Sequence, residues 1–125
     1  LRLTNRQVAC HLLLSEYWNT QTSPHLMLEL SPPQVGQLMT ATAMHVGEVA
    51  RNPYHRSLPA WLMDGARRGA ERVGLPGQAA TSMRMAALYG WQLWNGEMKE
   101  GPKACVKSNE PLDELFTHDQ LFQSA

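Results

Sequence analysis

The sequence has few of the residues that point directly to a particular chemistry. Only two of its 125 residues are cysteines, Cys10 and Cys105, too few for a disulfide scaffold and without the paired spacing of a zinc site. No apolar run approaches the roughly 18 residues that a membrane span requires, and no signal-peptide pattern is visible. We therefore expect a cytoplasmic protein of about one domain, with no membrane partner.

Neither sign of charge is in excess. Arginine plus lysine and aspartate plus glutamate both number 11, so the formal net charge is zero, whereas a dedicated nucleic-acid binder usually carries a basic excess. The charges are sorted along the chain, because residues 1–95 carry eight arginines and five acids, while residues 96–125 carry three lysines and six acids. This balance disfavours nucleic acid as a partner and distinguishes the C-terminal segment from the rest.

Motifs for metal, cofactor or catalytic chemistry are also missing. None of the five histidines lies three or four residues from another, the spacing at which a helix presents two ligands together. No glycine-rich phosphate loop follows a candidate strand, and no nucleophile signature surrounds Cys10. We expect no metal site, no cofactor and no catalytic residue; a small helical enzyme using Cys10 or a histidine remains the second alternative.

Helix signals are what the sequence does contain. Ser31, Pro32 and Gln34 supply an N-cap, a first-turn proline and a capping-box partner, which predict a helix that continues unbroken to about Arg51. Thr4 with Gln7 fits a second capping box. The predicted helices cover about residues 5–18, 32–51, 57–73, 78–94 and 112–122.

These helices predict an all-α fold, a compact bundle of four to five helices with a short C-terminal helix after a polar linker. Residues 1–95 would form the helical core, residues 96–111 the linker and residues 112–125 the C-terminal amphipathic helix. The segment HLMLEL alternates weakly and is treated as a loop, whereas ACVKS in the linker could form a short strand.

The first predicted helix is apolar on two sides. Val8 and Leu12 project one way, whereas Cys10, Leu13 and Leu14 project another. Such a helix is either central to the core or shared with another chain. In segment 78–94, by contrast, the apolar residues gather on one face, which predicts a core helix.

The predicted helix 32–51 carries a second indication of a partner. Its apolar stripe keeps one direction, so the break that a DNA-reading helix-turn-helix needs is not expected. Its opposite face is a strip of small side chains, although each glycine inside a helix costs about 1 kcal/mol relative to alanine. A backbone of the same chain or of a partner should therefore approach this strip closely. The strip consists of Gly36, Thr40, Ala43 and Gly47.

The stretch DGARRGAER has two readings. Arg67, Arg68 and Arg72 could contact an anionic ligand, but Asp64 and Glu71 lie at helical spacing from them, which favours a solvated, salt-bridged face. Gly65 and Gly69 line up as a second narrow face suited to tight packing.

The C-terminal segment predicts a short amphipathic helix. It could either fold back over the core or bind a neighbouring subunit or target protein. Its apolar side is formed by Leu112, Leu115, Phe116 and Phe122.

Together these patterns predict a small, non-enzymatic regulatory or adaptor protein of the inhibitor or anti-activator type. It would act by binding another protein and would form a homodimer with the two-sided first helix or the small-residue strip at its interface. The first alternative is a nucleic-acid-binding transcriptional regulator that uses an arginine-bearing helical face. That face would comprise Arg51, Arg56, Arg67, Arg68 and Arg72.

Overall fold

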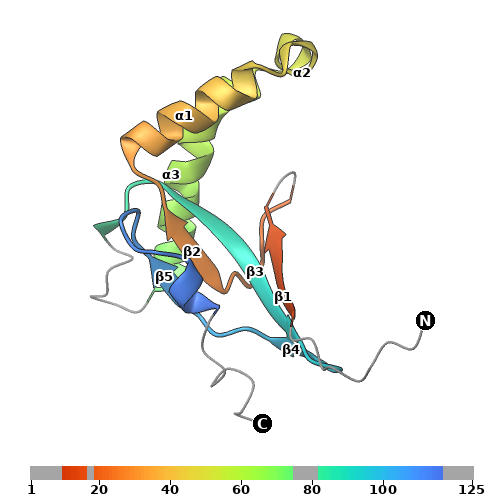
Figure 1. The fold of residues 1–125 in the computed structure, drawn as a ribbon. Helices are drawn as coiled ribbons and strands as arrows, with labels where there is room; N and C mark the ends of the chain where they lie inside the picture. Colours follow the sequence, from red (N-terminus) through yellow and green to blue (C-terminus); the bar gives the residue numbers. More distant parts are fainter. Residues whose placement is uncertain (1–9, 17–18, 75–81, 117–125) are drawn as a thin grey trace, which may run out of the picture.

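The computed structural model describes residues 10–16, 19–74 and 82–116 (Figure 1). The elements follow in the order β1 (Cys10–Ser15), β2 (Leu26–Glu29), α1 (Pro32–Ala43), α2 (Val46–Arg51), α3 (Tyr54–Arg72), β3 (Ala86–Trp94), β4 (Met98–Glu100) and β5 (Ala104–Val106). A short 3-10 helix, Asp113–Leu115, follows β5.

A five-stranded mixed sheet is the framework of the molecule. Its strand order is β1-β3-β2-β5, and β4 also pairs with β3. β3 is antiparallel to β1, β2 and β4, whereas β2 and β5 are parallel. The predicted all-α fold, a compact bundle of four to five helices with a short C-terminal helix after a polar linker, is therefore wrong.

Two of the predicted helices contain strands instead. β3 lies within segment 78–94 and is buried on both faces, with Ala86 and Leu88 on one side and Trp91 and Leu93 on the other. A strand covered on both faces is apolar at most positions, and such a run also matches a helical period. β1 lies within segment 5–18, and its pairing with β3 overrides the predicted helix there. Residues 5–9, 17–18 and 78–81 lie outside the described part.

The two faces of the sheet carry separate cores. On one face α3 packs over β2 and β3, and on the other the 3-10 helix packs around Trp91. The indole Nε1 of Trp91 donates a hydrogen bond of 3.1 Å to Nδ1 of His11, and the ring of Phe116 lies edge-on at 5.6 Å from the indole. The first core contains Met27, Ala66, Val73, Met83, Ala86 and Leu88, and the second contains Leu26, Trp91, Leu93 and Val106.

Two glycines let α3 approach the sheet closely. A Cβ at Gly65 would overlap the carbonyl oxygen of Ala86, and one at Gly69 would lie 2.7 Å from side-chain atoms of Leu88 and Met27. The predicted tight packing of this narrow face is confirmed.

The helices before this contact extend away from the sheet as a helical arm, residues 32–61, with α2 at its tip (Figure 1). The predicted capping box is present, since Ser31 Oγ accepts from the Gln34 N–H and Gln34 Oε1 accepts from the Ser31 N–H. The prediction of an unbroken helix to Arg51 is wrong, because the chain leaves helical geometry at His45. The Thr42 hydroxyl bonds the carbonyl of Leu38 in the last turn of α1, an arrangement that weakens and bends helices.

The segment 96–111 contains β4 and β5, and the short strand expected in ACVKS is confirmed as β5. Within the predicted C-terminal helix, Asp113–Leu115 forms a 3-10 turn, and residues 117–125 lie outside the described part. None of the helices described is both long and apolar enough to cross a membrane.

Candidate functional site

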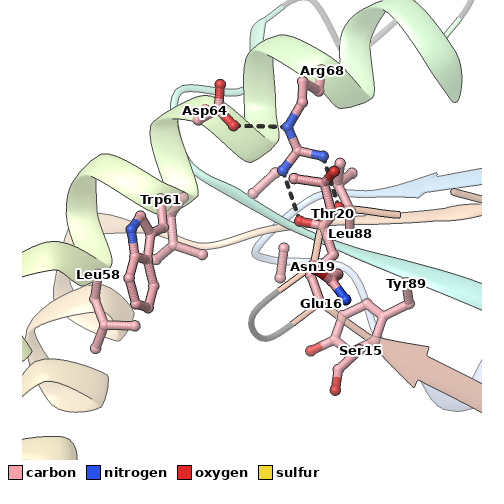
Figure 2. A pocket seen from close by; sticks show the side chains of 13 residues that line it. Ser15, Glu16, Asn19, Thr20, Leu58, Trp61, Asp64, Arg68, Leu88 and Tyr89 are labelled. Atoms are coloured by element: carbon pink, nitrogen blue, oxygen red, sulfur yellow. Dashed lines mark hydrogen bonds and ion pairs between the residues drawn. The ribbon is translucent and has the colours of Figure 1, made fainter. Parts of the chain in front are cut away.

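A cleft of about 320 Å³ opens between α3 and the sheet, at the end of β1 (Figure 2). Trp61 and Leu58 form one side of it, and the chain that follows β1 forms the other. The lining residues are Ser15, Glu16, Asn19, Thr20, Leu58, Trp61, Leu62, Asp64, Arg68 and the strand residues 86–89.

The cleft follows from two local features of the chain. β1 ends at Ser15, opposite Tyr89, so the first residues of β3 have no β1 neighbour. α3 is held against β3 at Gly65, and Trp61, one helical turn earlier, stands where the helix leaves the sheet. A gap therefore remains between the helix, the start of β3 and the end of β1.

An ion-pair network closes one end of the cleft. The guanidinium of Arg68 bonds both carboxylate oxygens of Glu16, each at 2.7 Å, and its Nε bonds Asp64 at 2.7 Å. The side chains of Arg68 and Glu16 are only 16% and 19% exposed, so solvent screens this pair less than a surface pair. The network joins α3 to the chain after β1 and fixes the distance between the two sides of the cleft.

The network keeps its members charged. Burial alone would raise the pKa of Glu16, but hydrogen bonds from Arg68 and from the Gln21 N–H, together with the charge of Arg68, lower it below the ordinary value. The pKa of Asp64 is lowered mainly by its hydrogen bond from Arg68. The pKa of Arg68 is raised, first by its hydrogen bonds to Glu16. Both carboxylates and the guanidinium are therefore ionised near neutral pH.

The three arginines predicted as an anionic contact all have partners within the chain. Arg67 pairs with Asp64 and Glu71, as its helical spacing predicts, and Arg72 donates to the carbonyl oxygen of Thr22. Of the three arginines, Arg68 forms the least exposed interaction, its ion pair with Glu16. Sequence reasoning missed its partner Glu16, which lies 52 residues earlier in the chain.

The small-residue strip on α1 and α2 faces solvent in the described chain. Gly36, Thr40 and Gly47 are exposed and Ala43 is half-buried. A Cβ at Gly36 or Gly47 would meet no atom within 4 Å. The close neighbour expected from the same chain is not among the described residues, and a contact with a partner remains a prediction.

The four C-terminal residues predicted to bind a partner lie in different surroundings. Leu115 and Phe116 pack against the core around Trp91, whereas Leu112 is 45% exposed. Phe122 lies outside the described residues. The described part of this segment is folded back on its own sheet.

The arm and the next turn of α3 carry exposed apolar side chains that sequence reasoning did not select. Met44, Val46 and Met63 are 76%, 72% and 60% exposed, and Trp61 is 46% exposed. The spacing of Trp61 and Gly65 could have indicated this position of Trp61. The two residues are four apart, so Trp61 lies one helical turn before the tight contact of Gly65 with the sheet.

No group of three potential metal ligands comes together in the described residues. Cys10 is exposed and Cys105 is half-buried, and burial raises the pKa of the Cys105 thiol. The fold and site define a mixed α/β domain with an open cleft beside a projecting helical arm. No protein-family model, curated protein or solved structure matches the chain at a significant level.

Proposed function

We propose that the protein is a small, non-enzymatic regulatory or adaptor protein that acts by binding another protein through its helical arm. A second copy of the chain is the first partner to test. The proposal includes a cytoplasmic location, which is supported by the presence of two cysteines without a disulfide between them.

One observation carries the proposal: the arm has almost no core of its own. Among residues 32–61, Val35 is the only buried side chain. Helices of this length depend on burying an apolar face, because propensity alone leaves them marginal in water. Contact with another protein would supply the burial that the chain does not.

The charge pattern of the arm supports the same proposal. No residue between Glu29 and Glu48 is Asp, Glu, Lys or Arg, although this stretch is largely exposed. Solvent-facing helix surfaces usually carry charges, whereas the centres of protein interfaces are depleted of them. Two such surfaces can meet without burying an unpaired charge, so the uncharged helix α1 is compatible with its own copy.

The arginine-based alternative has less support. Arg67, Arg68 and Arg72 each donate to an acceptor within the chain, so phosphate binding would have to replace existing bonds. No observation on the described residues favours an enzyme over a binding protein.

Sedimentation equilibrium at tens of micromolar tests the proposal directly. We expect the native chain to be a dimer and Met44→Asp to be a folded monomer, because a carboxylate at an apolar interface loses its hydration without gaining a partner. Met98→Asp on β4 is the matched control, since Met98 is also exposed but lies away from the arm. The control should remain a dimer.

Hydrogen exchange tests the proposal if the partner of the arm is a protein other than a second copy of the chain. Without a partner, the amides of α1 should exchange much faster than those of β3, because the arm opens without disturbing the sheet. A monomeric native chain whose α1 amides are as protected as those of β3 would contradict the proposal, since the arm would then be stable alone.

A further inference from the structure

The cleft beside Trp61 is a site in its own right, separate from the exposed tip of the arm. We propose that it binds one neutral aromatic ring that carries a hydroxyl group, a phenol in chemical terms. The ring could belong to a free small molecule or to a tyrosine side chain of another protein, and the chemistry of recognition is the same in both cases.

The volume of the cleft is sufficient for a small ligand. At about 320 Å³ it lies at the lower end of the roughly 300–1,000 Å³ that ligand pockets occupy. A cavity of roughly 150 Å³ already holds benzene, so the cleft has room for a ligand of one ring.

The walls favour an aromatic ring. The indole of Trp61 is 46% exposed and lies beside Leu58 on α3 (Figure 2), and Leu62 and Leu88 also line the cleft. Two aromatic rings in an offset or edge-to-face arrangement attract each other by more than the burial of their apolar area accounts for. A ring placed between Trp61 and Leu88 would cover the exposed indole.

The charges favour a neutral ligand. Glu16 and Asp64 both bond Arg68, and the second oxygen of Asp64 bonds Arg67. These charged groups already pair with one another, so an anion or a cation in the cleft would lose hydration without gaining an unpaired counter-charge.

The polar side chains on the β1 side of the cleft can form a hydrogen bond with a hydroxyl group of the ligand. Ser15, Asn19 and Thr20 line the cleft there, and each can donate or accept a hydrogen bond. A purely hydrocarbon ring would leave this side of the cleft without a partner. The combination of an indole wall and a neutral polar side is what selects a phenol.

NMR titration of the full chain with p-cresol tests the proposal. The Trp61 indole N–H signal, assigned with Trp61→Phe, should shift and saturate in the millimolar range, as expected for a fragment-sized ligand. The charged analogues p-toluate and 4-methylbenzylammonium should bind about tenfold more weakly or worse, because each must lose hydration of its charge. Equal or tighter binding of either ion would overturn the proposal.

Two variants locate the binding. Trp61→Ala should weaken p-cresol binding by about tenfold, the size of one aromatic contact. Trp94→Ala is the matched control, because Trp94 is 45% exposed but does not line the cleft. In Trp61→Ala the readout is the backbone amide of Leu88. An unchanged affinity in folded Trp61→Ala would overturn the proposal.

Two further arms separate the sources of the ring. If N-acetyl-tyrosinamide binds several-fold more tightly than p-cresol, a tyrosine side chain is the natural ligand, and the reverse order identifies a free phenol. Residues 17–18 connect lining residues and lie outside the described part, so Trp18→Ala is also titrated. Binding that occurs only in this variant would overturn the proposal, because a ring of the chain itself would be the occupant.

Ligand binding should not depend on dimerisation through the tip of the arm. The monomeric variant Met44→Asp should bind p-cresol as the native chain does. Loss of dimerisation with retained ligand binding would separate the two proposals, and so would the opposite outcome.

Discussion

The two ends of α3 lie in very different surroundings. From Leu62 to Val73 the helix packs on the sheet, with Leu62, Gly65, Ala66 and Gly69 buried. From Tyr54 to Trp61 the same helix belongs to the arm and buries no side chain fully. Both halves form one continuous helix, so helix formation alone does not create a core.

The difference separates stability from recognition. Most burial, and therefore most of the hydrophobic contribution to folding, lies in the sheet and the half of α3 that covers it. The arm contributes little burial and much exposed apolar surface. Regions of low local stability are where binding segments are usually found.

Tryptophan truncation should give the largest effect and the clearest contrast between the regions. Trp91→Ala should lower the free energy of unfolding by about 3–5 kcal/mol, because the indole is 1% exposed and the change leaves a cavity. Trp61→Ala should lower the free energy of unfolding by about 1 kcal/mol or less, because Trp61 is a half-exposed residue of the arm. Urea denaturation measures both. Equal costs would contradict the division into a stable sheet and a weakly packed arm.

Replacing a glycine by alanine should have opposite effects on stability in the two regions. Gly65→Ala should destabilise by about 2–3 kcal/mol, because its Cβ would overlap the Ala86 carbonyl and the backbones must separate. In the monomer, Gly36→Ala should stabilise by about 0.5–1 kcal/mol, since open space surrounds Gly36 within the chain and alanine favours helix. Thermal denaturation at one protein concentration distinguishes them. A destabilising Gly36→Ala would indicate a close neighbour there, as an interface would provide.

The Glu16–Arg68 pair allows a smaller, pH-dependent test at the junction of the regions. Glu16→Gln should destabilise by about 1–2 kcal/mol at neutral pH, between the values for exposed and buried pairs. Because the folded-state pKa of Glu16 is lowered, its contribution is complete above the unfolded pKa and is lost as pH falls through the folded value.

The stability difference between the native chain and Glu16→Gln should therefore be constant above about pH 5 and shrink below about pH 4. Arg67→Gln is the control, because Arg67 is 62% exposed and should contribute less than about 0.5 kcal/mol. A difference that grows in acid would contradict the assignment.

Metal and disulfide removal should give the smallest effect in either region. Neither a chelator nor a reductant should change the melting temperature. The two cysteines are free thiols and none of the described residues forms a metal cluster. Differential scanning fluorimetry with and without each reagent measures this. A drop of several degrees with either one would reveal a structural role for a thiol or ion.

Local signals were predictable from the sequence, and distant pairings were not. The Ser31–Gln34 capping box and the packing face of Gly65 and Gly69 depend on residues a few positions apart, and both are present. β3 was mistaken for a helix because a strand buried on both faces has no strict alternation to reveal it. The break at His45 has no glycine or proline to mark it.

The cleft was beyond sequence reasoning for the same reason. Its polar end needs Glu16 beside Arg68, and its floor is a strand that was predicted to be a helix. The arginines of α3 could be matched with Asp64 and Glu71 from helical spacing, but no spacing rule connects them to a residue near the start of the chain.

The register of β1 on β3 also has a consequence for how fast the protein forms. These neighbours are separated by about eighty residues of chain, so their pairing must wait for a large loop to close. During synthesis, β1 would emerge first and remain without its partner until β3 had been made, while the intervening helices could already fold from local contacts. Refolding from denaturant should accordingly be slow, on the millisecond-to-second scale typical of long-range pairings, with the sheet as its last step.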